Sequence, residues 1–245
     1  MERRQVFDLP PIRVRVTEHQ LITCHPRRGR AGIDAAGVLG RFSRIAVHDA
    51  WAPYDTYPDV AHQLCCAHAV RELRAAAEAA PTRNGRHWAT QAADALVAIQ
   101  KLVTDAATTA ANTGAGPVDS DALGIQIHAY RCATLIGAAQ TRARSTPIMR
   151  RHHALARRLV DRHDDYLRFA HDPRVPADNN GSERDIRMIK LRQKVSGCLR
   201  TLAGAQQFCA IRSYLSTAAK HGKHFFHTLV MLAEGHPWPW LPALP

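Results

Sequence analysis

A continuous block of helix-forming sequence, residues 65–172, is the feature that most restricts the fold of this chain. Ala, Leu and Arg are frequent in it, and Ala92, Leu96 and Ile99 recur at the spacing of one helix face. Breaks at Pro81, TRNGRHW and ANTGAGPVDSD divide the block, and strand-like alternation is almost absent. The block therefore predicts helices at about residues 65–80, 88–106, 121–142 and 147–172.

Short strand and helix signals precede this block. The alternating stretch VRVTEHQLITC, residues 14–24, has the pattern of a strand, and DAAGVLGRF, residues 34–42, has that of a short helix. In SRIAVHDAW the apolar run from Ile45 to Val47 resembles a buried strand that ends beside Asp49. Acids often follow strands in α/β active sites, although a structural Asp that starts a turn explains the same residue.

The stretch ADNNGSERDIRMIKLRQK, residues 177–194, joins an acidic start to a basic helix. Asn180-Gly-Ser-Glu183 fits a capping box, in which Glu183 turns back to the amide of the N-cap residue. Five cations follow within eleven residues: Arg184, Arg187, Lys190, Arg192 and Lys194. A solvated helix normally mixes its charges, so the alternative is that the carboxylate and the cations serve a polyanion together. Both interpretations can hold at once.

Two further helices are expected toward the end of the chain. QFCAIRSYLSTAAKHG, residues 207–222, carries apolar residues at helical spacing and ends at Gly222, a residue suited to a C-cap. FFHTLVMLAEG, residues 225–235, leads into a tail rich in Pro and Trp.

The net charge indicates a polyanionic partner. There are 33 Lys and Arg against 21 Asp and Glu, a formal charge of +12, and nucleic acid is the commonest partner of such a chain. A basic surface kept for solubility is the alternative. No apolar run approaches the roughly 20 residues of a membrane helix, and the first residues lack the apolar stretch of a signal peptide. We therefore expect no membrane partner, a cytoplasmic location and six reduced cysteines.

Several histidines and cysteines invite a site. Adjacent Cys65 and Cys66 followed by His68 lack the spacing of common zinc sites, so zinc is not expected there. His68 and Arg71 lie three residues apart and share a helix face, from which they could reach DNA or an active site, or form a plain surface pair. The His152-His153 pair lies in an arginine-rich segment and is expected on a solvated or DNA-facing side.

Asp49 and Glu183, on either side of the helical block, are the candidate catalytic acids and metal ligands. Hard divalent cations such as Mg²⁺ take oxygen ligands, and two-metal phosphoryl-transfer sites use carboxylates from distant segments. The cations that follow Glu183 would then contact DNA phosphates beside the metal.

Several segments together resemble insertion-sequence transposases of the IS66 type, over about residues 26–240. They are HDAWAPYDTY, CCAHAVREL, ADNNGSERDIRMIKLRQKVSGCLRT and the closing AAKHG and LAEGHPW. The resemblance implies an RNase H-like fold with three catalytic acids (a DDE triad) and a helical insertion between the second and the third. By motif position Asp49 matches the second acid and Glu183 the third. The expected DNA-binding residues are His68, Arg71, Asn179, Asn180, Arg184, Arg187, Lys190, Arg192 and Lys194.

Enzymes of this type cut and join transposon DNA through Mg²⁺-dependent attack on phosphodiesters, first by water and then by a 3′-hydroxyl. The family's first acid lies on an earlier strand, whereas Asp8 and Asp34 of this chain follow no convincing core strand. Residues 1–24 instead resemble the family's far-upstream zinc-binding region without most of its cysteines. We therefore expect an internally deleted transposase that binds Mg²⁺ weakly and has little strand-transfer activity alone.

The expected fold class is mainly α with a small α/β part, an incomplete RNase H-like core that carries a large helical insertion. The expected divisions are residues 1–24 as the zinc-region remnant, 25–60 with the second acid, 61–176 as the helical insertion and 177–245 with the third acid and the last helices. Expected partners are transposon-end and target DNA, and a second copy or a full-length relative. The alternatives are a non-catalytic DNA-binding or assembly protein derived from a transposase, and a product without function.

Overall fold

The computed structural model describes residues 29–80, 87–113, 118–195 and 201–239. The chain divides into two units, one formed by Ile22–Ile211 and one formed by Met1–Leu21 with Arg212–Pro245, and each is considered by itself. The strand expected at residues 14–24 lies outside the described residues. The four-part division expected from the sequence stays a prediction.

A small parallel sheet opens the larger unit. Strand β1, Ile45–His48, confirms the expected strand, although Ile45–Val47 are half-buried and only His48 is buried. It pairs with β2, Ala61–Leu64, so that His48 lies opposite Leu64. The 3-10 helix η2, Ala52–Thr56, lies in the connection between the two strands. The sequence did not predict β2, because AHQL is short and continues a connection rich in Pro and Tyr.

Upstream of the sheet the expected helix at residues 34–42 is replaced by two short elements. Helix α1 covers Arg30–Ala35, and the 3-10 helix η1 covers Leu39–Arg41. Gly37 lies between them with a φ of +67°, a left-handed conformation that interrupts a continuous helix.

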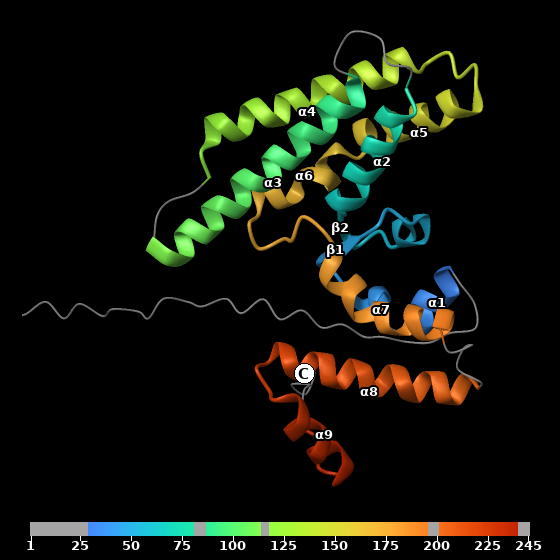
Figure 1. Cartoon of the computed structure of the whole chain (residues 1–245), viewed down its shortest axis with the longest axis vertical. Helices are drawn as coiled ribbons and strands as arrows, with labels where there is room; N and C mark the ends of the chain where they lie inside the picture. Colours follow the sequence, from blue (N-terminus) through green and yellow to red (C-terminus); the bar gives the residue numbers. More distant parts are fainter. Residues whose placement is uncertain (1–28, 81–86, 114–117, 196–200, 240–245) are drawn as a thin grey trace, which may run out of the picture. The chain divides into compact units, whose positions relative to one another are not determined.

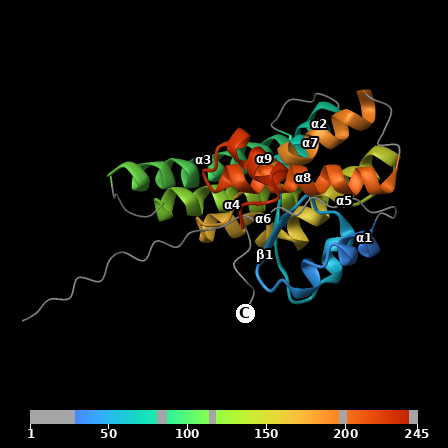
Figure 2. The ribbon, with the colours of Figure 1, turned by 90° about the horizontal axis from the view of Figure 1, so that it is seen from below.

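Five helices form the block that follows the sheet (Figures 1 and 2): α2 Cys66–Glu78, α3 Trp88–Thr113, α4 Ser120–Gln140, α5 Pro147–Asp161 and α6 His163–His171. The long helices α3 and α4 run side by side, and α2 packs against α3 while α5 packs against α4. The Asp119 carboxylate caps α4, and the Thr146 hydroxyl with Pro147 at the first position starts α5.

The single helix expected at residues 147–172 is divided into α5 and α6. The break falls at Arg162, whose φ of −115° and ψ of 28° lie outside the helical region. The guanidinium of Arg162 contacts Asp55, on the connection between the strands, and Asp165 of α6. The contact with Asp55 spans 107 positions, and no local sequence signal such as Pro or Gly marks the break.

The core of this unit lies between the helices and the sheet. Large side chains that are almost fully buried include Leu64, Leu73, Trp88, Leu96, Tyr130, Leu159 and Phe169. Gln63 is also fully buried, and its amide accepts a hydrogen bond from the Phe169 N–H and donates to the Tyr166 carbonyl. Helix α7, Asn180–Val195, follows the core helices in the chain.

The unit that contains Arg212–Pro245 has two helical segments, the end of α8 (Leu202–Lys220) and α9 (Phe225–Ala233). Gly222 ends α8 with a φ of +73°, and the Lys223 N–H donates to the Ala218 carbonyl, which confirms the expected C-cap. The Trp238 N–H donates to the Tyr214 hydroxyl oxygen. Within the described residues no helix combines the length and apolar character that crossing a bilayer requires.

Two glycines of α4 should respond oppositely to a methyl group. A Cβ on Gly137 would lie 2.4 Å from the Trp88 ring, so Gly137→Ala is expected to lower the free energy of unfolding by about 1–3 kcal/mol. A Cβ on Gly124 meets nothing within 4 Å, so Gly124→Ala is expected to raise it by about 0.5–1 kcal/mol. Urea denaturation of both variants measures the difference, and equal effects would contradict the Gly137–Trp88 contact.

Candidate functional site

Asp49 is the first residue after β1. The backbone carbonyl of His48 accepts a hydrogen bond of 2.8 Å from the Cys65 N–H, so Asp49 follows a point where β1 meets the start of α2. The Asp49 carboxylate accepts a hydrogen bond of 3.2 Å from the Trp51 N–H. Ala50, between them, has a φ of +64°, a left-handed conformation that is strained for a residue with a Cβ. The turn after β1 therefore fixes the direction of this carboxylate.

Glu183 lies in the first turn of α7, and its Oε1 is 3.2 Å from Nε2 of His68 on α2. The Cys66 N–H donates to the Ala177 carbonyl, which ties the segment before α7 to the start of α2. A capping box requires Glu at the third residue of the helix. Because α7 begins at Asn180, Glu183 is its fourth residue. The Glu183 carboxylate is thus directed to a neighbouring helix.

Residues next to these acids carry polar atoms without partners. His68 Nδ1 and Asn179 Oδ1 are buried and have no hydrogen-bond partner among the described residues. The Asp178 carboxylate accepts a hydrogen bond of 2.9 Å from the Asn180 N–H, and it raises the pKa of the nearby Cys65 thiol after the larger effect of burial. Carboxylates and a free amide oxygen are the donor types that a hard cation takes.

Asp49 and Glu183 are thus each linked to the short segment Cys65–His68. Asp49 follows the residue bonded to Cys65, and Glu183 contacts His68. Their convergence on one metal ion stays a prediction.

The two cysteines of this segment are free thiols and are buried. Burial raises the pKa of the Cys65 thiol, and it raises that of Cys66 well above its usual value. Both are therefore protonated at neutral pH, a state in which a thiol is a poor nucleophile.

Four cations near the two acids are exposed and form no ion pair with any described acid. They are Arg71 and Arg74 on α2 and Arg184 and Arg187 on α7. Arg71 and Arg74 line an open groove along α2 with Ala67, Val70, Ala75 and Glu78. The side chains of Lys190, Arg192 and Lys194 lie outside the described residues.

Several arginines of α5 and α6 are instead paired with acids of the same unit. Arg157 contacts Asp161, Arg158 contacts Glu72, and Arg168 contacts Asp165. The expectation for His153 is wrong, because this ring is 7% exposed and bonds to Thr141 and Arg144. These contacts stabilise the fold and leave fewer charges for a partner.

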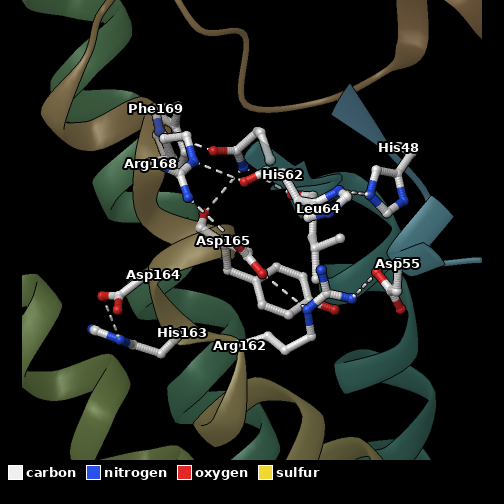
Figure 3. A network of polar contacts seen from close by, with 12 residues as sticks. His48, Asp55, His62, Leu64, Arg162, His163, Asp164, Asp165, Arg168 and Phe169 are labelled. Carbon is white, nitrogen blue, oxygen red and sulfur yellow. Dashed lines mark hydrogen bonds and ion pairs between the residues drawn. The ribbon is translucent and has the colours of Figure 1, made fainter. Parts of the chain in front are cut away.

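A second polar cluster, which the sequence did not predict, lies on β1, β2 and the connection between them (Figure 3). His48 Nε2 is 3.0 Å from His62 Nδ1, and Asp55 accepts a hydrogen bond of 2.7 Å from Arg162. Burial, and then the charges of His62 and Arg162, lower the pKa of His48 to about 4. His48 and His62 are 14 positions apart and lie on neighbouring strands, one of which had no sequence signal.

Asp178 is a further residue near the acids that sequence reasoning missed. Its position two residues before the start of α7 is the available signal, because Asp commonly accepts the first free amides of a helix.

One comparison with known proteins identifies a family. A family model described as Transposase IS66 family matches residues 11–207. No curated protein and no solved structure matches the chain.

The His48 ring is expected to stay neutral well below pH 6. Its folded pKa of about 4 lies below the ordinary 6.5, so the unfolded chain binds this proton more readily, and the contribution of His48 disfavours folding progressively as the pH falls from about 6.5 to 4. Histidine NMR titration measures the pKa, with His48→Gln to assign the resonance. A midpoint near 6.5 would contradict the burial of this ring.

Proposed function

Because the chain belongs to the IS66 family of transposases, we propose that Asp49 and Glu183 are the second and third acids of its DDE site and that the surrounding cations hold DNA. The family match implies DNA transposition. The observation that carries the assignment is the contact between Glu183 and His68, since it brings the start of α7 to the helix that follows Asp49 and β2. The same two acids are those that motif position selects.

The residues present fit a Mg²⁺ ion, which DDE transposases typically use. Asp49 and Glu183 would hold it through carboxylate oxygens, and the unpartnered Asn179 Oδ1 is a further oxygen donor beside Glu183. When bound, Mg²⁺ would stabilise negative charge on a phosphodiester undergoing attack. His68 would orient the Glu183 carboxylate, and the fixed turn at Ala50 would orient Asp49.

DNA would lie along α2 and α7. The exposed Arg71, Arg74, Arg184 and Arg187 have no acidic partner among the described residues, so they can neutralise phosphates without first breaking an ion pair. Asn179 and Asn180 lie at the start of the same helix as Glu183, where backbone amides favour an anion. This arrangement would place the phosphodiester backbone beside the two acids.

We expect catalysis by this chain alone to be impaired, because no acid in the described residues upstream of β1 follows a strand. Asp34 lies on helix α1 rather than on a strand, and its carboxylate is occupied by the Tyr57 hydroxyl at 2.6 Å and by Arg30. Two carboxylates instead of three would weaken metal binding and leave the attacking oxygen poorly oriented.

The second candidate function is a non-catalytic DNA-binding or assembly protein derived from a transposase. The exposed arginines favour it, since DNA binding needs no first acid. A second copy of the chain or a full-length relative would be the natural partner.

Cleavage of DNA tests the catalytic assignment. Purified full chain, Mg²⁺ or Mn²⁺ and a plasmid that carries transposon ends are expected to give little nicking. Any cleavage that does occur should fall at least a hundredfold in Asp49→Asn and in Glu183→Gln, while Asp94→Asn on α3 should leave it unchanged. Efficient cleavage by the wild type that Asp49→Asn abolishes would refute the impairment and support the acids. Cleavage that survives both substitutions would refute the acids.

Salt dependence of DNA binding tests the proposed DNA surface. Each phosphate contact adds about 0.9 to the slope of log affinity against log salt concentration. The double variant Arg184→Ala/Arg187→Ala should therefore lower this slope by about 2 and weaken binding in fluorescence anisotropy. The matched control is Arg157→Ala/Arg150→Ala on α5, which removes the same charge. A larger loss in the control pair would place the DNA surface elsewhere.

A further inference from the structure

Two imidazoles and one carboxylate converge at the small sheet. One ligand atom from each of His48, Asp55 and His62 lies within 4.8 Å of the other two. His48 comes from the end of β1, His62 from β2 and Asp55 from η2, so three separate elements contribute. Figure 3 shows the two rings next to each other and Asp55 close by.

The spacing of the two rings suits a shared ion. Zinc-to-nitrogen bonds are about 2.0–2.1 Å, so two imidazole nitrogens on one tetrahedral ion lie about 3.3 Å apart. His48 Nε2 and His62 Nδ1 are 3.0 Å apart, within a few tenths of an ångström of that separation. A carboxylate oxygen is the usual third ligand beside two imidazoles, and water takes the remaining position.

The cluster also has a protected base and an open side. His48 is 3% exposed and stacks on Tyr54, while Asp55 has an exposed carboxylate. The backbone carbonyl of His62 accepts a hydrogen bond of 2.8 Å from Arg168, which fixes the backbone at this residue. An ion would therefore enter past Asp55 and meet rings whose positions are already fixed.

Two existing interactions would be exchanged on binding. Arg162 would release Asp55 but keep its contact of 2.9 Å with Asp165. The Ala50 N–H now donates to His48 Nδ1, so the His48 proton is on Nε2 and would move to Nδ1 when Nε2 binds the ion. Because both rings are neutral, binding of the ion releases no proton. The loss of the Ala50 hydrogen bond makes the affinity for the metal ion lower than that of a closed structural zinc site.

We propose that His48, His62 and Asp55 form a binding site for a divalent transition-metal ion of the Zn²⁺ class. Imidazole nitrogen selects such ions over Mg²⁺, which prefers oxygen, so the two kinds of metal would occupy different sites. A bound ion would join β1, β2 and the connection between them. It would thereby stiffen the turn that holds Asp49, the residue after His48.

Metal titration of the full chain tests this site. Calorimetry with Zn²⁺, in excess Mg²⁺ so that oxygen sites are filled, is expected to show one ion per chain, and Co²⁺ should give the strong visible absorption of a four-coordinate site. His62→Ala and Asp55→Asn should each weaken Zn²⁺ binding at least tenfold. Arg162→Gln should tighten it, because the competing guanidinium is removed from Asp55.

The controls separate this cluster from other sites. His152→Ala removes an unrelated histidine and should bind Zn²⁺ as the wild type does, and so should the acid variant Asp49→Asn/Glu183→Gln. A competing pair among the described residues is His128 with Cys132 on α4, where Nε2 and Sγ are 3.4 Å apart. Loss of binding in Cys132→Ser, or wild-type binding in both His62→Ala and Asp55→Asn, would overturn the proposal. If His62→Ala does not fold, the exposed variant Asp55→Asn tests the site instead. Zn²⁺ should raise the melting temperature of the wild type but not that of Asp55→Asn.

Discussion

The buried amide of Gln63 is the interaction on which the sheet depends. A two-stranded parallel sheet has little stability of its own, and here the amide binds the backbone of α6 through the Phe169 N–H and the Tyr166 carbonyl. Arg168 adds a second link, from α6 to the His62 carbonyl. Because these bonds are shielded from water, losing either partner would leave a polar group unsatisfied in the core. The helical block therefore holds the sheet in place.

This anchoring also decides where the acidic residues lie. With β2 fixed to α6, β1 is fixed through the register that sets His48 opposite Leu64. Cys65 then leads directly into α2, which carries His68 to the Glu183 carboxylate. The path from the core to the candidate acids thus consists of hydrogen bonds and the contact between Glu183 and His68.

The helices were largely predictable from sequence because Ala- and Leu-rich segments with clear breaks define them locally. Strand β1 was also predictable from Ile45–Val47, whereas β2 was not, since AHQL acquires its conformation from pairing and from the Gln63 bonds. Arg162, where the predicted helix breaks, contacts Asp55 more than a hundred residues upstream, a partner that no local pattern reveals. The contact between Glu183 and His68 is equally long-range, and motif resemblance rather than periodicity selected Glu183.

The internal pairing of the arginines in α5 and α6 changes how the surplus charge acts. Three arginines form an ion pair with an acid of the same unit: Arg157, Arg158 and Arg168. Four exposed arginines form no ion pair with a described acid: Arg71, Arg74, Arg184 and Arg187. The charges on α2 and α7 are therefore free to attract a polyanion before contact, which should speed the encounter with DNA at low salt concentration.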